Sequence, residues 1–153
     1  MDETYIKNFK QWNIEKEQLN HRELPLDFFF LEREIWWAAI GINIGREMDG
    51  KNDNYERPIL VIKKINEELL WAMPITSTQK NEGGFCSIIY KDKPYTLAIQ
   101  QMRTLSSNRL LRMIARISET DFVKILENIS QFLLPKQNET PVSGGISVDV
   151  TGE

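Results

Sequence analysis

The sequence is poor in the residues that most often build metal centres and cross-links. Its 153 residues include one cysteine, Cys86, and one histidine, His21. A lone cysteine excludes an internal disulfide, gives no metal cluster and suits a reducing compartment. The single histidine lies in the N-terminal appendage, outside the main domain, so the domain has no histidine for a zinc site or a Ser-His-Asp triad. We therefore expect no metal and no cofactor, and a buried, unreactive role for Cys86.

Long apolar runs and a secretion signal are also missing. No apolar run approaches the roughly 20 residues that cross a bilayer. The first ten residues, MDETYIKNFK, lack a basic head followed by an apolar stretch. These observations predict a cytoplasmic protein that does not enter a membrane. Its 41% hydrophobic and 27% charged residues are typical of a folded soluble protein.

Charge is distributed unevenly along the chain. The net charge is −3, yet residues 80–118 contain seven basic residues and two acidic ones. An acidic protein with such a stretch can present a phosphate-binding face, because the field near a surface depends on nearby charges. A solvated basic surface explains the same charges equally well.

The residue pattern divides the chain into three parts. Residues 1–33 read as a partly helical N-terminal appendage, in which Pro25 ends the helical spacing and Phe28 to Phe30 dock the appendage onto the core. It either packs on the core or occludes a groove. Residues 34–134 form the main domain. Residues 135–153 are rich in Gly, Ser, Thr and Pro and predict a flexible tail.

Within residues 34–134, short β-rich runs predict a mainly β, mostly antiparallel barrel or sandwich. The runs are IWWAAIGINI, PILVIKKI, LLWAMPIT, FCSIIY, YTLAIQQM and LLRMIARI. Asn66-Glu67 fits a hairpin turn between two of them. Residues 118–134 change to helical spacing, with Ser118 as N-cap and Asp121 in a capping box. The predicted inner face of this helix consists of Phe122, Ile125, Leu126, Ile129, Phe132 and Leu133.

The acidic loop in IGREMDGKNDNYERPILVI, residues 44–62, first suggests a calcium site. An EF-hand counted from Asp49 needs an oxygen ligand, a glycine and a glutamate at its third, sixth and twelfth positions. The sequence has Lys51, Asn54 and Leu60 there. The calcium interpretation therefore fails.

The same stretch ends in Arg57-Pro58, which opens a predicted strand. Proline is tolerated at the first position of a strand and stiffens the backbone beside Arg57. A rigid guanidinium and the hydroxyl of Thr76, at the end of a later strand, suit a phosphate group. An ordinary surface ion pair of Arg57 with Glu47 or Glu56 is the competing interpretation.

Several blocks, in order, resemble the MazF/PemK (Kid) family, the toxins of type II toxin–antitoxin systems. They are EIWWAAIGINIGREMDGK, ERPILVI, MPITST and IQQMRTLSSNRLLRMIARIS, within about residues 34–133. The resemblance implies an SH3-like β-barrel of the CcdB/PemK type with a C-terminal helix. It also implies a homodimeric, metal-independent endoribonuclease held in check by a cognate antitoxin. Single-stranded RNA would be cut by its 2′-OH, giving a 2′,3′-cyclic phosphate and a 5′-OH.

Three catalytic residues follow from the resemblance. Arg57 matches the arginine of the family's Arg-Pro and would stabilise charge on the phosphate or donate a proton. Thr76 matches the threonine of Pro-x-Thr and would bind the scissile phosphate. Glu47 matches the glutamate before Arg-Pro, and would hold Arg57 in place or help deprotonate the 2′-OH.

RNA-binding residues are expected around these three. Ser77, Thr78 and Lys80 follow the Pro-x-Thr turn, and Gln101 and Arg103 match the family's Gln-x-Arg strand. The last two belong either to the RNA-binding face or to the dimer interface.

The sequence also departs from the family. The Kid-type branch has an aspartate and an arginine where this chain has Gln100 and Ala98, so the Kid-type proton chemistry is excluded. The loop from Arg46 to Glu56 is longer than in compact members, so the cut site does not transfer. The alternative function is a barrel without chemistry, which binds RNA or inhibits a protein target as the related CcdB toxins inhibit gyrase.

Overall fold

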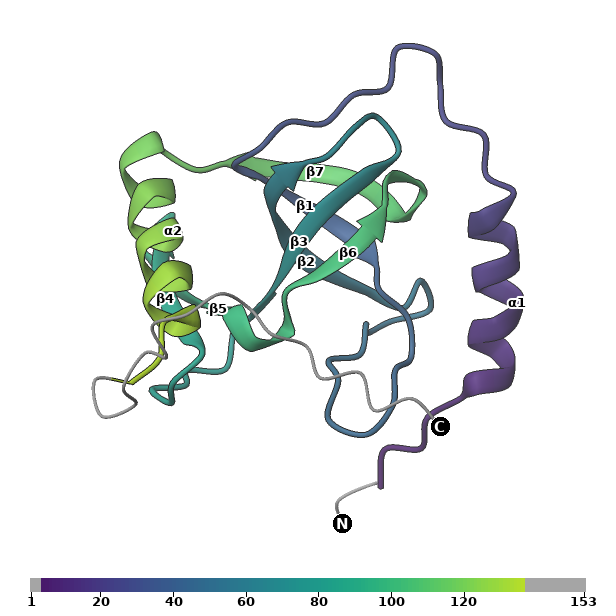
Figure 1. The fold of residues 1–153 in the computed structure, drawn as a ribbon. Coiled ribbons are helices and arrows are strands. Elements are labelled where there is room, and N and C mark those ends of the chain that lie inside the picture. Colours follow the sequence, from purple (N-terminus) through teal and green to yellow (C-terminus); the bar gives the residue numbers. More distant parts are fainter. Residues whose placement is uncertain (1–3, 137–153) are drawn as a thin grey trace, which may run out of the picture.

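The computed structural model describes residues 4–136, and within them the chain is mainly β (Figure 1). In chain order, its helices and strands are α1 (Phe9–Asn20), β1 (Glu34–Ala39), β2 (Glu56–Lys64), β3 (Leu69–Thr76), β4 (Phe85–Tyr90), β5 (Lys93–Ala98), β6 (Arg103–Ser106), β7 (Leu110–Arg116) and α2 (Glu119–Leu133). Nearly all of the predicted flexible tail lies outside the described residues.

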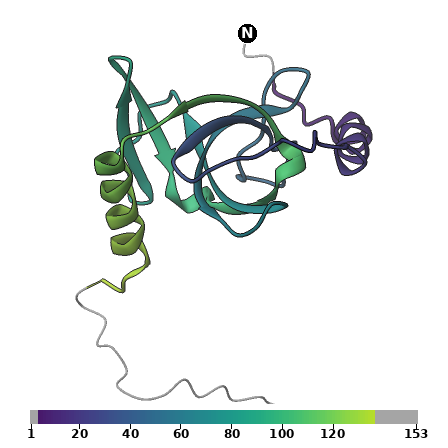
Figure 2. The same ribbon diagram turned by 90° about the horizontal axis from the view of Figure 1, so that it is seen from above.

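The seven strands pair antiparallel in one strongly curved sheet (Figure 2). The order is β4-β5-β3-β2-β1-β7, and β6 also pairs with β3. The start of β3, from Leu69 to Ala72, pairs with β6, whereas Ile75 and Thr76 pair with β5. One edge of β3 is therefore divided between two neighbours. For this reason the sheet branches. Its two end strands, β4 and β7, do not pair with each other within residues 4–136, so the ladder stays open instead of closing into the expected barrel.

Apolar side chains fill both sides of β2, which explains the continuous apolar run in its sequence. Leu60 and Ile62 point to the core cluster under α2. Ile59 and Val61, which alternate with them, point to a second cluster inside the curve of the sheet. The curved sheet thus separates two small cores.

The C-terminal helix confirms its predicted start and only part of its predicted face. Ser118 caps α2, since its Oγ accepts a hydrogen bond from Asp121 N at 3.1 Å and donates to Asp121 Oδ2 at 2.9 Å. The helix contacts β4, an edge strand of the sheet (Figure 1), so a narrow stripe of apolar side chains on α2 is enough to cover the core. Of the predicted inner face, Phe122, Ile125 and Ile129 are buried, while Leu126, Phe132 and Leu133 remain exposed.

The strand predictions are close, with one strand missed. LLWAMPIT and FCSIIY coincide with β3 and β4, and the predicted hairpin turn joins β2 to β3. Gln101 was expected on a strand, but it ends a short 3-10 turn, Ile99–Gln101, after β5. Arg103 then opens β6 as a separate strand of four residues.

The N-terminal segment packs against the sheet on the side away from α2 (Figures 1 and 2). Phe30 is fully buried in the core. Trp12 of α1 is buried against Gly41, where an added Cβ would overlap the indole ring. Arg22 Nη1 donates to Leu110 O over 2.7 Å. In the part of the chain that is described, no helix has the length and apolar character needed to cross a membrane.

Candidate functional site

The connection between β1 and β2, residues 40–55, is a long loop whose two sides meet at glycines. Gly50 N donates to Gly41 O over 2.8 Å, and Gly41 N donates to Tyr55 O over 3.1 Å. A Cβ at Gly50 would overlap the main chain of Tyr55. The loop therefore depends on glycine at this close approach, and it delivers the chain into β2 just before Arg57.

Main-chain oxygens hold Arg57. Its Nε donates to Asp49 O over 2.8 Å, and its Nη1 donates to Ile75 O over 3.3 Å. Burial lowers the pKa of Arg57, an effect that the Asp49 carboxylate opposes. The alternative of an ion pair with Glu47 or Glu56 is wrong, because neither carboxylate pairs with Arg57 in the described structure. The guanidinium is fixed and yet keeps donors available.

Arg57, Thr76 and Ser77 meet at one cavity of about 340 Å³. Thr76 ends β3, and its Oγ1 accepts a hydrogen bond from Thr78 N over 3.2 Å, which leaves the hydroxyl proton free for another acceptor. Three of the predicted residues thus place hydrogen-bond donors around a shared space. Among residues 4–33, none lines this cavity, so the appendage packs on the core without occluding it.

Thr78 and Lys80 lie beyond this cavity, on the exposed connection after β3. Thr78 belongs to the turn that Thr76 caps. The Lys80 ammonium stands 5.1 Å from the centre of the Phe85 ring, a cation–π contact. Both residues are exposed to solvent and flank the cavity in sequence.

Aromatic side chains that sequence reasoning missed line the same cavity: Trp37, Tyr90 and Tyr95. The signal for Trp37 was its alternation with Trp36, because successive strand residues face opposite sides and only one of the pair is core. The Arg112 guanidinium lies 4.9 Å from the centre of the Trp37 ring. Flat, partly exposed rings next to arginines are suited to stacking on planar ligands.

Glu56 also lines the cavity, and Arg112 neutralises it. Their two hydrogen bonds are both 2.9 Å long, and the Glu56 side chain is only 6% exposed. The hydrogen bonds from Arg112 lower the pKa of Glu56. Glu56 is therefore an ionised carboxylate whose two oxygens are both bonded to Arg112, and it is not available as a general base.

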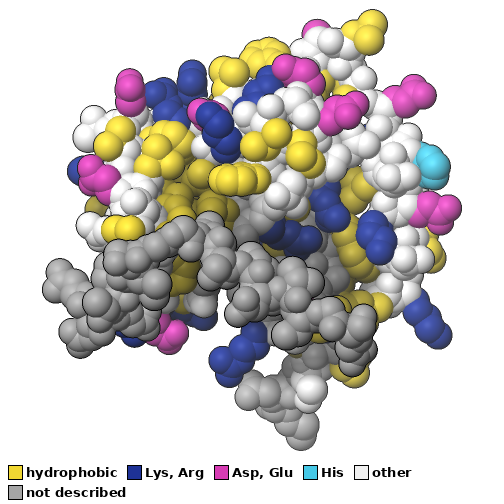
Figure 3. All heavy atoms as spheres, in the orientation of Figure 1, with side chains coloured by type: hydrophobic (Ala, Val, Ile, Leu, Met, Phe, Trp, Pro, Cys, Tyr) yellow, Lys and Arg dark blue, Asp and Glu magenta, His cyan; other side chains and the backbone are white. Residues whose placement is uncertain are grey.

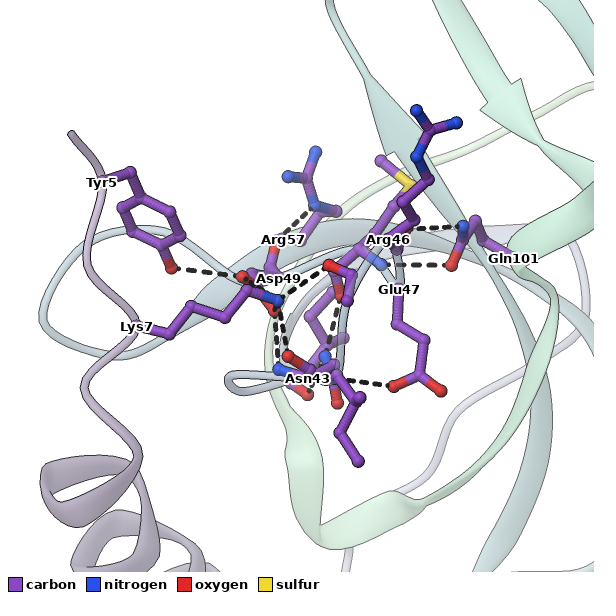
Figure 4. Close-up of polar contacts among 12 residues, drawn as sticks. Tyr5, Lys7, Asn43, Arg46, Glu47, Asp49, Arg57 and Gln101 are labelled. Carbon is purple, nitrogen blue, oxygen red and sulfur yellow. Dashed lines mark hydrogen bonds and ion pairs between the residues drawn. The ribbon is translucent and has the colours of Figure 1, made fainter. Parts of the chain in front are cut away.

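Glu47 lies apart from Arg57, contrary to the expectation that it holds the arginine. Its carboxylate accepts a hydrogen bond from Ile44 N over 3.0 Å, within its own loop. Glu47 lines a second hollow, separate from the cavity at Arg57. Pro74 of β3 lines the second hollow, whereas the next residue of the strand, Ile75, lines the Arg57 cavity. Figure 4 shows the Glu47 carboxylate directed away from Arg57.

Gln101 and Arg103 line this second hollow together with Glu47. Gln101 Oε1 accepts a hydrogen bond from Met48 N over 3.1 Å, and Gln101 Nε2 donates to Arg46 O over 3.2 Å. Arg103 Nη1 donates to Asn43 Oδ1 over 3.2 Å. Both residues support the loop between β1 and β2 and are separate from the Arg57 cavity.

The basic stretch of residues 80–118 does not form one phosphate-binding face. Arg109 Nη1 donates to Ala39 O over 2.9 Å, and Arg112 is paired with Glu56. In the face shown in Figure 3, apolar side chains gather between α2 and the sheet, and basic ones are scattered over the middle. Several of these arginines therefore stabilise the fold, and the basic side chains that line the cavity, Lys51 and Arg57, come from outside this stretch.

Comparisons with known proteins agree with this architecture. The model of the PemK-like, MazF-like toxins of type II toxin–antitoxin systems matches residues 32–133. The fold is similar to the Mycobacterium tuberculosis toxin MazF-mt6, with a TM-score of 0.50 and 16% identity over 65% of this chain and 95% of that one. It is also similar to an endoribonuclease in complex with its cognate antitoxin from Mycobacterial species, with a TM-score of 0.54 and 16% identity over 71% of this chain and 99% of that one. No curated protein matched in sequence.

These two structures are similar in fold alone, whereas the family model covers more than half of the chain. The match begins just before β1 and ends with α2, so it contains the whole sheet and the cavity beside Arg57. The chain belongs to the family of PemK-like, MazF-like toxins of type II toxin–antitoxin systems.

Proposed function

We propose that the protein is a toxin endoribonuclease that cleaves single-stranded RNA without a metal ion. The observation that carries the proposal is the cavity in which Arg57, Thr76 and Ser77 converge, within a chain of this toxin family. Of the proposed catalytic residues, Arg57 and Thr76 lie at this cavity. We further propose that the curved sheet is this chain's version of the SH3-like barrel.

In the proposed reaction, the ribose 2′-OH attacks the adjacent phosphorus. The bond from phosphorus to the 5′ oxygen breaks, and that oxygen takes a proton from water, which leaves a 2′,3′-cyclic phosphate and a 5′-OH. Negative charge grows on the phosphate oxygens in the transition state. Arg57, preset by its bonds to Asp49 O and Ile75 O, and the Thr76 hydroxyl would donate to those oxygens without having to reorganise.

The aromatic lining supports an RNA ligand. Trp37, Tyr90 and Tyr95 offer faces on which bases stack, and such stacking contributes about 1–3 kcal/mol per base. A nucleotide with its base on these rings would place its phosphate near Arg57. Lys51, which also lines the cavity, would attract the RNA backbone.

The proton of the 2′-OH needs an acceptor. Glu56 is occupied by Arg112, and Glu47 lies in the other hollow. The positions of the Kid-type acid and base hold Ala98, which is fully buried, and Gln100. We propose that the proton passes to water, so that charge stabilisation by Arg57 supplies most of the catalysis.

The remaining predicted residues would extend the RNA path. Ser77, Thr78 and Lys80 would contact the backbone beyond the scissile phosphate. Gln101 and Arg103 would shape the second hollow for a flanking nucleotide.

The proposed partners follow the same family. A cognate antitoxin would cover the RNA groove, and the active form would be a homodimer. A homodimer interface would cover exposed apolar side chains outside the Arg57 cavity, such as Met113 of β7.

The test is cleavage of single-stranded RNA in EDTA. Arg57→Ala should reduce the rate at least about 10²-fold, as expected when a transition-state charge stabiliser is lost. Arg116→Ala, at an exposed arginine of β7 outside the cavity, is the matched control and should cleave like the wild type. Equal rates for the wild type and Arg57→Ala would refute the proposal.

A second variant separates Glu47 from the chemistry. Because its carboxylate bonds within its own loop, Glu47→Gln should retain activity within about 10-fold of the wild type. A loss as large as that of Arg57→Ala would show that Glu47 reaches the reacting atoms and is the base.

The non-catalytic alternative has one observation in its favour, the lack of an unoccupied carboxylate or imidazole in the described lining of the Arg57 cavity. It predicts RNA binding without any cleaved product. A gyrase effect without RNA binding would indicate the CcdB-like version instead.

A further inference from the structure

The orientation of Arg57 depends on a loop that the N-terminal segment ties down. One of its two anchors, Ile75 O, belongs to β3. The shorter bond is to Asp49 O, in the loop between β1 and β2. The position of the Arg57 guanidinium therefore depends on the conformation of the loop at Asp49.

The Asp49 carboxylate sets that conformation, and Lys7 is its counter-charge (Figure 4). Asp49 Oδ1 accepts a hydrogen bond from Asn43 N over 2.6 Å, and Asp49 Oδ2 lies 3.1 Å from Lys7 Nζ. The Lys7 ammonium also donates to Asn43 O and, over 3.1 Å, to Gly45 O. Tyr5 OH donates to Asp49 Oδ2 over 3.3 Å. With side chains only 23% and 12% exposed, Lys7 and Asp49 form a shielded pair.

Lys7 itself is placed by the docked helix that follows it. Trp12 of α1 packs on the ring of Tyr55, with centroids 5.4 Å apart, and the Arg109 guanidinium lies 5.7 Å from a Trp12 ring centre. A continuous set of contacts therefore runs from α1 through Lys7 and Asp49 to Arg57.

We propose that Lys7 and Asp49 are positioning residues for Arg57, so that the N-terminal segment is part of the active site's support. This inference rests on the proposed role of Arg57. Lys7 acts in two ways: it orders the loop that carries Asp49 O, and it occupies the Asp49 carboxylate. Without Lys7, that carboxylate is free to turn to the guanidinium and withdraw its donors from the phosphate.

Kinetics of the full-length chain test the proposal. Lys7→Met should lower kcat at least about 10-fold with little change in KM, since misplacing a catalytic group slows the chemistry more than binding. Lys7→Arg should restore most of the rate. Lys10→Met is the matched control, because Lys10 is exposed on α1 and forms no ion pair among residues 4–136. A rise in KM with an unchanged kcat for Lys7→Met would overturn the proposal. An equal loss of kcat in Lys10→Met would overturn it as well.

A double-mutant cycle isolates the coupling. If Lys7 acts through Arg57, the variant Lys7→Met/Arg57→Ala should be no slower than Arg57→Ala. Additive losses would show that Lys7 acts elsewhere.

A measurement without RNA keeps this test separate from that of the proposed function. The Arg57 Nε–H, assigned by its loss in Arg57→Lys, should exchange slowly with solvent in ¹⁵N NMR. Its exchange should accelerate in Lys7→Met and stay slow in Lys10→Met. Unchanged exchange in Lys7→Met overturns the inference even if the protein cleaves RNA, and accelerated exchange supports it even if the protein does not.

Discussion

At the scale of single residues, main-chain geometry decides which charges are available for function. Arg57 bonds to two carbonyl oxygens, and Arg112 instead takes the buried carboxylate of Glu56. Arg57 lines the cavity, whereas Arg112 contacts two of its lining residues, Glu56 and Trp37, so the two arginines have different tasks. An arginine that bonds to neutral oxygens keeps its charge uncompensated, whereas one paired with a carboxylate does not.

The pair of Glu56 and Arg112 predicts a pH dependence of stability. Because the hydrogen bonds from Arg112 lower the pKa of Glu56, the unfolded chain binds more protons than the folded one below the ordinary value of 4.5. The stabilisation is complete above that value and is lost as the pH falls through the lowered pKa.

Arg112→Met should therefore reduce stability at neutral pH, and the difference from the wild type should shrink on acidification towards about pH 3. Urea unfolding at several pH values measures it. Arg116→Met, at an exposed arginine on the same strand, serves as control. A difference that stays constant with pH would contradict the assignment.

At the scale of elements, α1 docks where the β1–β2 loop turns. Gly41 has φ +85°, and a Cβ there would overlap the Trp12 indole. Gly45, in the same loop, has φ +55° and open space around it. The two glycines thus share a left-handed backbone and differ in whether a helix rests on them.

This difference gives a matched pair of variants. Gly45→Ala should cost about 1 kcal/mol, the strain of a left-handed alanine. Gly41→Ala should cost more, because it also pushes Trp12 and α1 away. Trypsin cleavage at Lys10 and Lys16 of α1 reports the displacement. Equal cleavage of the two variants would show that α1 is not held at Gly41.

At the scale of the whole molecule, the appendage and the family domain share a core. Phe30 is 0% exposed in the cluster that also contains Trp36 and Ile59, whereas its neighbour Phe29 is 62% exposed. The segment before β1 is therefore structural, although the family match begins only at residue 32.

Phe30→Ala should lower the free energy of unfolding by about 3–5 kcal/mol, the usual cost of emptying a buried phenylalanine site. Phe29→Ala should change it by no more than about 0.5 kcal/mol. Urea denaturation compares the two. A small effect of Phe30→Ala would mean that Phe30 does not join the appendage to the core.

The sequence by itself determined the local structure and three residues of the candidate cavity, Arg57, Thr76 and Ser77. Alternation and β-branched runs placed most strands, Ser118 marked the start of α2, and the ordered blocks resembled the right family. Arg57 and Thr76 were found because their positions at strand ends are local features. Helix caps and strand patterns depend on residues that are close in the chain, so they can be predicted from the sequence without the fold.

Only the tertiary structure decided how these residues are partnered. Glu47 and Glu56 are both acidic residues near Arg57 in sequence, but the loop carries Glu47 into another hollow and the pairing of β1 with β7 brings Arg112 to Glu56. Lys7 meets Asp49 across 42 positions of sequence. Hydrogen bonds and ion pairs act over a few ångströms in space, and the folded path of the chain sets which groups come that close.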